Sequence, residues 1–217
     1  MAEPHTDPAT PTREHLLDVA ETLFLEQGTG VSLRAIVREA GQRNQSALQY
    51  HFGNRDGLIT ALVDRRQEQV EARRAELVRK ALTENKTPDL REICALQVRP
   101  VFLLCREQAS FRDALGLLGQ RLLSSDRRFL EFEINQNAPS LFQLWQMALD
   151  QIDDHPLEVL SLRVENSHGM ALLAMSRRAK QKDSFKGRRA ELFFNNLVDQ
   201  LLAMLTTPIS DETRSQL

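Results

Sequence analysis

Residues 33–52 constrain this chain more than any other segment. Their first part carries apolar residues at helical spacing and ends at Gly41, which suits the left-handed conformation that closes a helix. In their second part Ala47, Leu48 and Phe52 share one helical face, so the polar residues between them point the other way. We therefore expect two short helices joined by a tight turn, the second with a polar outer side.

Such a helix, apolar inside and rich in hydrogen-bonding groups outside, suits the major groove of DNA. Arginine pairs well with guanine and glutamine with adenine, which makes Arg43, Gln45 and Gln49 candidates for base edges. Ser32, Arg34, Tyr50, His51 and Arg55 are candidates for phosphate contacts, and the same polar surface includes Asn44 and Ser46.

Two simpler interpretations of this surface stay open. The segment also fits a helical hairpin whose polar residues only face water, and Ser32, Asn44 and Asn54 also fit as helix caps. The local charge of the segment favours DNA binding over these two interpretations. Residues 34–55 hold four arginines against one acid, a local charge of +3 in a chain of net charge -2, and His51 can add to it.

A wider pattern surrounds this segment. It comprises Leu16 to Phe24, Gly28, Ser32 to Ile36, Ala40-Gly41, Ala47-Leu48, His51-Phe52, Arg55 and Leu58. Together these residues resemble the amino-terminal domain of the TetR family of transcriptional regulators, over roughly residues 12–60. The family's turn and third helix read Gly-Val-Ser-x-Gly-Ala-Leu-Tyr-x-His-Phe, followed two residues later by a phosphate-binding Lys. The counterparts here are Gly41, Asn44, Ala47, Leu48, His51, Phe52 and Arg55.

The sequence departs from that pattern in two places. The turn over residues 41–44 is one residue longer, which affects the angle of the reading helix. Gln49 stands at the usual tyrosine position, and Tyr50 follows one place later. The tyrosine's phosphate contact would then come from a neighbouring side of the helix.

The whole chain is expected to be all-α. We expect a disordered arm over residues 1–11, a helix-turn-helix DNA-binding domain over 12–60, a larger helical effector-binding and dimerisation domain over 61–208, and a tail over 209–217. Helices are expected at about 12–27, 55–82, 111–123, 139–152, 156–178 and 186–205, with another between Thr87 and Cys105 that Pro100 should kink. The charged run from Arg65 to Arg79 is expected to be a solvated helix face.

The resemblance also implies a homodimer formed through the last two helices and a ligand cavity in the middle of the chain. Leu157, Val164 and Met175, then Phe193, Leu197 and Leu201, give those two helices wide apolar faces, and Gly169 permits a close approach. Candidate ligand-binding residues are Phe102, Cys105, Phe142, Trp145, Asn166 and His168. Ordinary core packing is the alternative for the apolar ones, and a hydrogen bond across the dimer is the alternative for Asn166 and His168.

The functional expectation is a repressor that a small, largely apolar ligand releases from a palindromic double-stranded operator. The alternatives are a helical adaptor that binds only protein and an all-α enzyme. We expect no enzymatic activity, cofactor or metal, because no pair of histidines has metal-binding spacing and Gly28-Thr29-Gly30 lacks the rest of a dinucleotide loop. No apolar run is long enough for a membrane span and the start resembles no signal peptide, so the cytoplasm is expected. Cys94 and Cys105 are expected to be reduced, buried thiols, with a redox sensor as the alternative.

Overall fold

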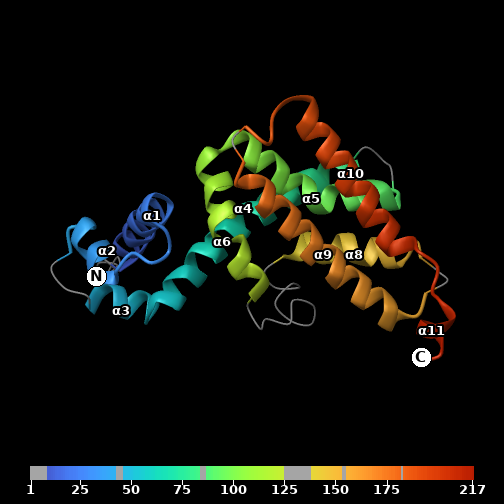
Figure 1. Cartoon of the computed structure of the whole chain (residues 1–217), viewed down its shortest axis with the longest axis horizontal. Coiled ribbons are helices and arrows are strands. Elements are labelled where there is room, and N and C mark those ends of the chain that lie inside the picture. The colour runs from blue at the N-terminus through green and yellow to red at the C-terminus, as the bar shows by residue number, and fades with distance from the viewer. Residues whose placement is uncertain (1–8, 43–45, 84–86, 125–137, 153–154, 182) are drawn as a thin grey trace, which may run out of the picture. The chain divides into compact units, whose positions relative to one another are not determined.

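The computed structural model describes residues 9–42, 46–83, 87–124, 138–152, 155–181 and 183–217 (Figure 1). Every regular element within these ranges is an α-helix, which confirms the predicted all-α class. The chain divides into two compact units, residues 1–66 and 67–217. The boundary falls inside the helix α4, Arg55–Thr83, which therefore contributes its first turns to one unit and the rest to the other.

The first unit is built from α1 (Ala9–Gln27), α2 (Leu33–Glu39), α3 (Ser46–Phe52) and the start of α4. Helix α1 packs against both α2 and α3. The core of this unit consists of fully buried apolar side chains from all four helices: Leu16, Leu17, Phe24, Ile36, Leu48, Leu58 and Leu62. Burial of these stripes holds helices together that are too short to be stable alone.

Local signals fix where these helices begin and end. The hydroxyl of Ser32 accepts a hydrogen bond from the Ala35 N–H at 3.1 Å, and the carboxamide of Asn54 accepts one from the Gly57 N–H at 2.9 Å. Gly41 has a φ of +67°, a left-handed conformation that costs glycine little. These contacts confirm the expected caps at Ser32 and Asn54 and the stop at Gly41.

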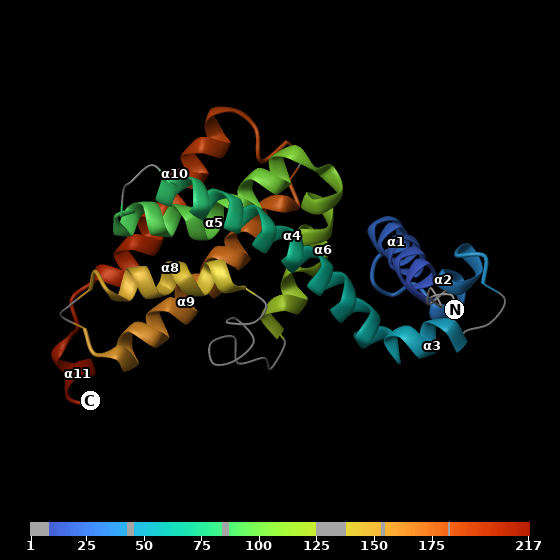
Figure 2. The same cartoon turned by 180° about the vertical axis from the view of Figure 1, so that it is seen from behind.

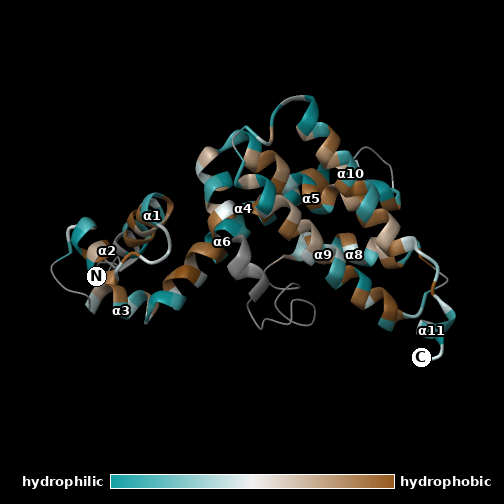
Figure 3. Cartoon of the chain, viewed as in Figure 1, coloured by the Kyte–Doolittle hydropathy of each residue, from teal (hydrophilic) through white to brown (hydrophobic). Residues whose placement is uncertain are grey.

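Among the described residues, the second unit contains the rest of α4 and six further helices. These are α5 (Leu90–Glu107), α6 (Ala109–Ser124), α8 (Pro139–Leu149), α9 (Leu157–Ala179), α10 (Gly187–Thr206) and the short α11 (Asp211–Arg214). Helix α5 is central, since it packs against α6, α8, α9 and α10, while α9 also packs against α6 and α10. Figure 2 shows α5 and α10 from behind, and Figure 3 shows apolar and polar residues alternating along α10.

Most predicted helix bounds lie within three residues of the observed ones. Helix α1 begins at Ala9 rather than Thr12, because Pro11 falls in the first turn, where a missing N–H costs nothing. Helix α8 ends at Leu149 rather than Ile152. Helix α11 lies in the segment expected to be a tail, where Ser210 caps it by accepting from the Thr213 N–H. Helix α5 continues through Pro100 as one element.

The expectation of a solvated face over Arg65 to Arg79 is wrong for three of its arginines. The side chains of Arg65 and Arg66 are only 20% and 15% exposed, and that of Arg74 is 5% exposed. Each of the three is paired with a carboxylate, which offsets the cost of removing its charge from water.

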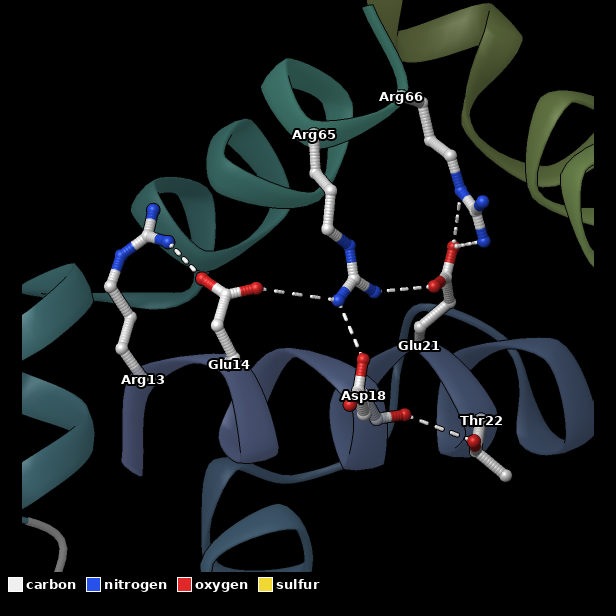
Figure 4. Close-up of polar contacts among 7 residues, drawn as sticks. All are labelled: Arg13, Glu14, Asp18, Glu21, Thr22, Arg65 and Arg66. Carbon is white, nitrogen blue, oxygen red and sulfur yellow. Dashed lines mark hydrogen bonds and ion pairs between the residues drawn. The ribbon is translucent and has the colours of Figure 1, made fainter. Parts of the chain in front are cut away.

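An ion-pair network joins α1 to α4 within the first unit (Figure 4). One carboxylate oxygen of Glu21 accepts from Arg65 and the other from Arg66, each at 2.5 Å, and Asp18 accepts from Arg65 at 2.6 Å. Burial lowers the pKa of Arg65, but the hydrogen bond to Asp18 and the charge of Glu21 outweigh it and raise that pKa overall. The network therefore fixes the start of α4 against α1.

Replacement of Glu21 tests the strength of this network. Glu21→Gln leaves two largely buried guanidinium groups without their shared carboxylate, and we expect the free energy of unfolding of the first unit to fall by about 2 kcal/mol. Asp18→Asn is the matched control, because the Asp18 side chain is 67% exposed, and it should cost under about 1 kcal/mol. Equal losses for the two variants in urea denaturation would contradict the assignment of Glu21 as the centre of the network.

Candidate functional site

Helix α3 has an apolar side and a polar side. Leu48 and Phe52, four residues apart, are buried against the first unit's core. Ser46, Gln49 and Tyr50 stand at positions i, i+3 and i+4 on the opposite side and are all exposed. Tyr50 is 80% exposed, unusual for so large an aromatic side chain. This outer side of α3 is available to a partner outside the chain.

Residues around α3 extend this surface. Ser32 and Arg34, at the start of α2, are exposed. His51 is half-buried, and its ring meets the ring of Tyr50 edge-on with centroids 5.0 Å apart. Arg55 is half-buried and donates from Nη1 to the carbonyl of Thr29 at 2.5 Å. Arg55 therefore stabilises the loop between α1 and α2, a role that sequence reasoning missed.

Of the ten predicted DNA-contact residues, the structure describes seven in the first unit: Ser32, Arg34, Ser46, Gln49, Tyr50, His51 and Arg55. The other three, Arg43, Asn44 and Gln45, lie outside the described residues. The reading helix was expected to start near Asn44, and its described part begins at Ser46.

Residues 16–62 match the family model described as "Bacterial regulatory proteins, tetR family". The amino-terminal unit is a TetR-family DNA-binding domain. The match includes α2 and α3, so the helix-turn-helix of this domain consists of the two short helices predicted from residues 33–52. No curated protein matches the sequence.

The second unit contains a largely buried polar cluster, which we call the Trp145 cluster: Glu71, Arg74, Trp145 and His168. Arg74 donates to Glu71 at 2.6 Å, and the other oxygen of Glu71 accepts from the Ser140 N–H at 2.6 Å. The Trp145 and His168 rings meet edge-on, with centroids 6.1 Å apart and planes at 86°. The cluster thus links α4, α8 and α9.

Burial governs the ionisation of this cluster. Burial and then the positive charge of Arg74 lower the pKa of His168 to about 4, so this histidine is neutral at neutral pH. Burial also lowers the pKa of Arg74, while the charge of Glu71 opposes that shift. The cluster therefore holds one balanced ion pair and a neutral imidazole.

The structure brings five of the six predicted ligand residues into or against one hydrophobic core and leaves Asn166 outside it. Trp145 and His168 lie together, and Phe142 lies one turn before Trp145 and is half-buried. Phe102 and Cys105 are buried in the same hydrophobic core as Trp145. Burial raises the pKa of Cys105 to about 12 and of Cys94 to about 11. Thiols this far from ionising react poorly, which favours structural cysteines over a redox sensor. Asn166 is exposed and lies apart from the buried group.

Sequence reasoning missed Glu71 and Arg74, because both lie in the charged run that was expected to face water. A signal was present: Val70, Arg74 and Val78 recur every four residues, so Arg74 shares one face of α4 with apolar neighbours.

Among the described residues, no helix is long and apolar enough to cross a membrane, and no group of three or more His, Cys, Asp or Glu side chains is arranged to hold a metal.

The shifted pKa of His168 predicts a pH dependence of stability. The unfolded chain takes up this proton near pH 6.5 and the folded chain only near pH 4. The stabilisation is complete above about pH 6.5 and is lost as the pH falls toward 4, with about 1 kcal/mol lost between pH 7.5 and 5.5. The free energy of unfolding is measured by urea denaturation at the two pH values, and we expect His168→Gln to remove the part of their difference that His168 causes. The exposed His15, changed to Gln, is the control and should leave the difference unaltered.

Proposed function

We propose that this TetR-family regulator is a homodimeric repressor, released from a palindromic operator by a small, largely apolar effector. Residues 12–60 would bind DNA, and residues 61–208 would bind the effector and the second copy. The observation that carries the DNA part is the outer side of α3, where Ser46, Gln49 and Tyr50 are all exposed. We propose the cytoplasm as its compartment, since its partner is DNA, and no catalytic role.

The contacts divide by chemistry. We assign Arg43, Gln45 and Gln49 to base edges, and Ser32, Arg34, Tyr50, His51 and Arg55 to phosphates. The outward position of Tyr50 supports its role, and the half-buried position of His51 beside it supports contact at the rim of the groove. Arg55 uses one N–H on Thr29 and keeps others for phosphate.

Exposed leucines support dimerisation through α9 and α10. On α9, Leu162, Asn166, Gly169 and Leu173 fall on one face of the helix, with Leu162 56% and Leu173 39% exposed. A Cβ added to Gly169 would meet nothing within 4 Å, so this face has room for a second helix. Leu192 on α10 is 68% exposed. Asn166 lies in this stripe, where it could hydrogen-bond to the second copy.

Release from the operator requires an effector that binds one conformation of the protein more tightly than the other. Equal affinity for both conformations would leave their populations unchanged. Helix α4 supports a role in transmission, since it starts in the DNA-binding unit and carries Glu71 and Arg74 in the other. A protein-binding adaptor is the second candidate, favoured only by the same exposed leucines.

The salt dependence of DNA affinity separates a DNA-binding regulator from a protein-binding adaptor. We expect Gln49→Ala to lose about 1–3 kcal/mol of preference for an operator selected from random duplexes over unselected DNA. Arg34→Ala should weaken binding to both duplexes and lower the slope of log K against log salt by about one.

Arg214→Ala is the matched control in fluorescence anisotropy, because it removes an exposed arginine of α11, outside the DNA-binding unit and the α9 stripe. It should leave both the preference and the slope unchanged. Affinity that does not respond to salt, or equal losses for Gln49→Ala on both duplexes, would contradict the proposed DNA contacts.

The α9 stripe makes a prediction about assembly. Leu162→Glu combined with Leu173→Glu places four charges in the proposed dimer interface, and we expect a monomer by sedimentation at micromolar concentration. Leu217→Glu is the control, since Leu217 is 55% exposed and lies at the chain end. A dimer that survives the double substitution would rule out this interface.

A further inference from the structure

Several buried N–H groups of the second unit have no acceptor among the described residues, and two of them belong to the Trp145 cluster. In the part of the chain that the structure describes, neither Nε1 of Trp145 nor Nε of Arg74 has a hydrogen-bond partner. Trp145 is 7% exposed and Arg74 is 4% exposed. A buried donor left without an acceptor is destabilising, and native proteins rarely keep one without a use.

The two donors belong to the same region. His168 contacts the ring of Trp145 directly and lies within the electrostatic influence of Arg74. The Arg74 partner Glu71 is bonded to Ser140, which precedes Trp145 on the same helix by less than two turns. Contacts from α4, α8 and α9 therefore converge on one place.

Helix α5 carries another buried donor of the second unit. Val78 of α4 packs with Ile93 and Leu96 of α5, while Arg73 pairs with Glu107 at 2.8 Å. The earlier residue of α4 pairs with the later residue of α5, so the two helices run antiparallel. Gln97 of α5 is buried, and its Nε2 has no hydrogen-bond partner among the described residues.

The unpaired groups specify the polar end of a ligand. The indole and the guanidinium can only donate, so they require an acceptor and offer nothing to a protonated amine. The charge of Arg74 is already balanced by Glu71 at 2.6 Å, and His168 is neutral. A carboxylate would therefore bring an uncompensated charge into a buried site, whereas an uncharged carbonyl would not.

We propose that the Trp145 cluster binds an uncharged, largely apolar molecule through a carbonyl-type acceptor of the ketone, ester or amide class, with Trp145 and Arg74 as donors. The half-buried side chains of Phe142 and Met170, on the helices that carry Trp145 and His168, supply contacts for its apolar body. The proposal rests on the proposed function only in calling this molecule the effector.

Four compounds with one cyclohexane ring test the proposal on the full-length protein: cyclohexyl methyl ketone, ethylcyclohexane, cyclohexanecarboxylate and cyclohexylmethylamine. Trp145 is the only tryptophan, so its indole N–H gives a single signal in a proton–nitrogen correlation spectrum. We expect the ketone to move this signal downfield saturably and to bind about tenfold more tightly than ethylcyclohexane. Tighter binding of the carboxylate or the amine, or an indole signal that the ketone leaves unmoved up to its solubility, would overturn the proposal.

Trp145→Phe keeps an aromatic ring and removes the donor. In ligand-observed saturation-transfer spectra, the preference of this variant for the ketone over ethylcyclohexane should fall by roughly threefold or more. Gln143→Ala is the control, because Gln143 is exposed on the same helix as Trp145, and it should keep the full preference. An unchanged preference in Trp145→Phe would refute the donor role.

Operator binding, measured in the same samples, keeps this proposal apart from the proposed function. Ketone binding at Trp145 without operator release would contradict ligand-relieved repression and leave the site chemistry standing. Operator release by ethylcyclohexane or the amine, with no effect of the ketone, would support ligand-relieved repression and overturn the site chemistry.

Discussion

Burial of Leu48 and Phe52 on one side of α3 determines what the other side can do. Both side chains pack into the first unit, and the helical period then directs Ser46, Gln49 and Tyr50 outward. The caps at Ser32 and Asn54 and the left-handed Gly41 set where α2 and α4 begin and where α2 ends. A reading surface on so short a helix is held by its core contacts and not by helix propensity.

Helix α4 uses charge differently in its two parts. In the first unit, Arg65 and Arg66 converge on Glu21 of α1, which fastens the start of the helix to the DNA-binding domain. In the second unit, Arg74 and Glu71 form a buried pair, and Glu71 is bonded to the start of α8. Buried ion pairs of this kind add little stability, but they permit few alternative arrangements, which suits a helix proposed to pass a signal.

The sequence predicted those features of the fold that depend on residues close together in the chain. Caps, glycine stops and apolar periodicity gave the all-α class and most helix bounds, and the motif from Gly41 to Arg55 gave the TetR family. Long-range pairing could not be predicted in this way. The partners of Arg65, Arg66 and Arg55 lie 26 to 47 residues away in the sequence. Arg65 and Arg66 were therefore expected to be solvated, and the contact of Arg55 with Thr29 was missed. For the same reason, Asn166 and His168 seemed equivalent, although one is exposed on α9 and the other contacts Trp145.

The most direct test of the central claim is a nuclease footprint of the purified protein on the DNA upstream of its own coding region. The account predicts a protected palindrome whose half-sites are centred about one helical turn, or a multiple of it, apart. Protection should weaken steeply as salt rises. Failure to protect any segment over competitor DNA at low salt would contradict the assignment of the outer side of α3 as a DNA-reading surface.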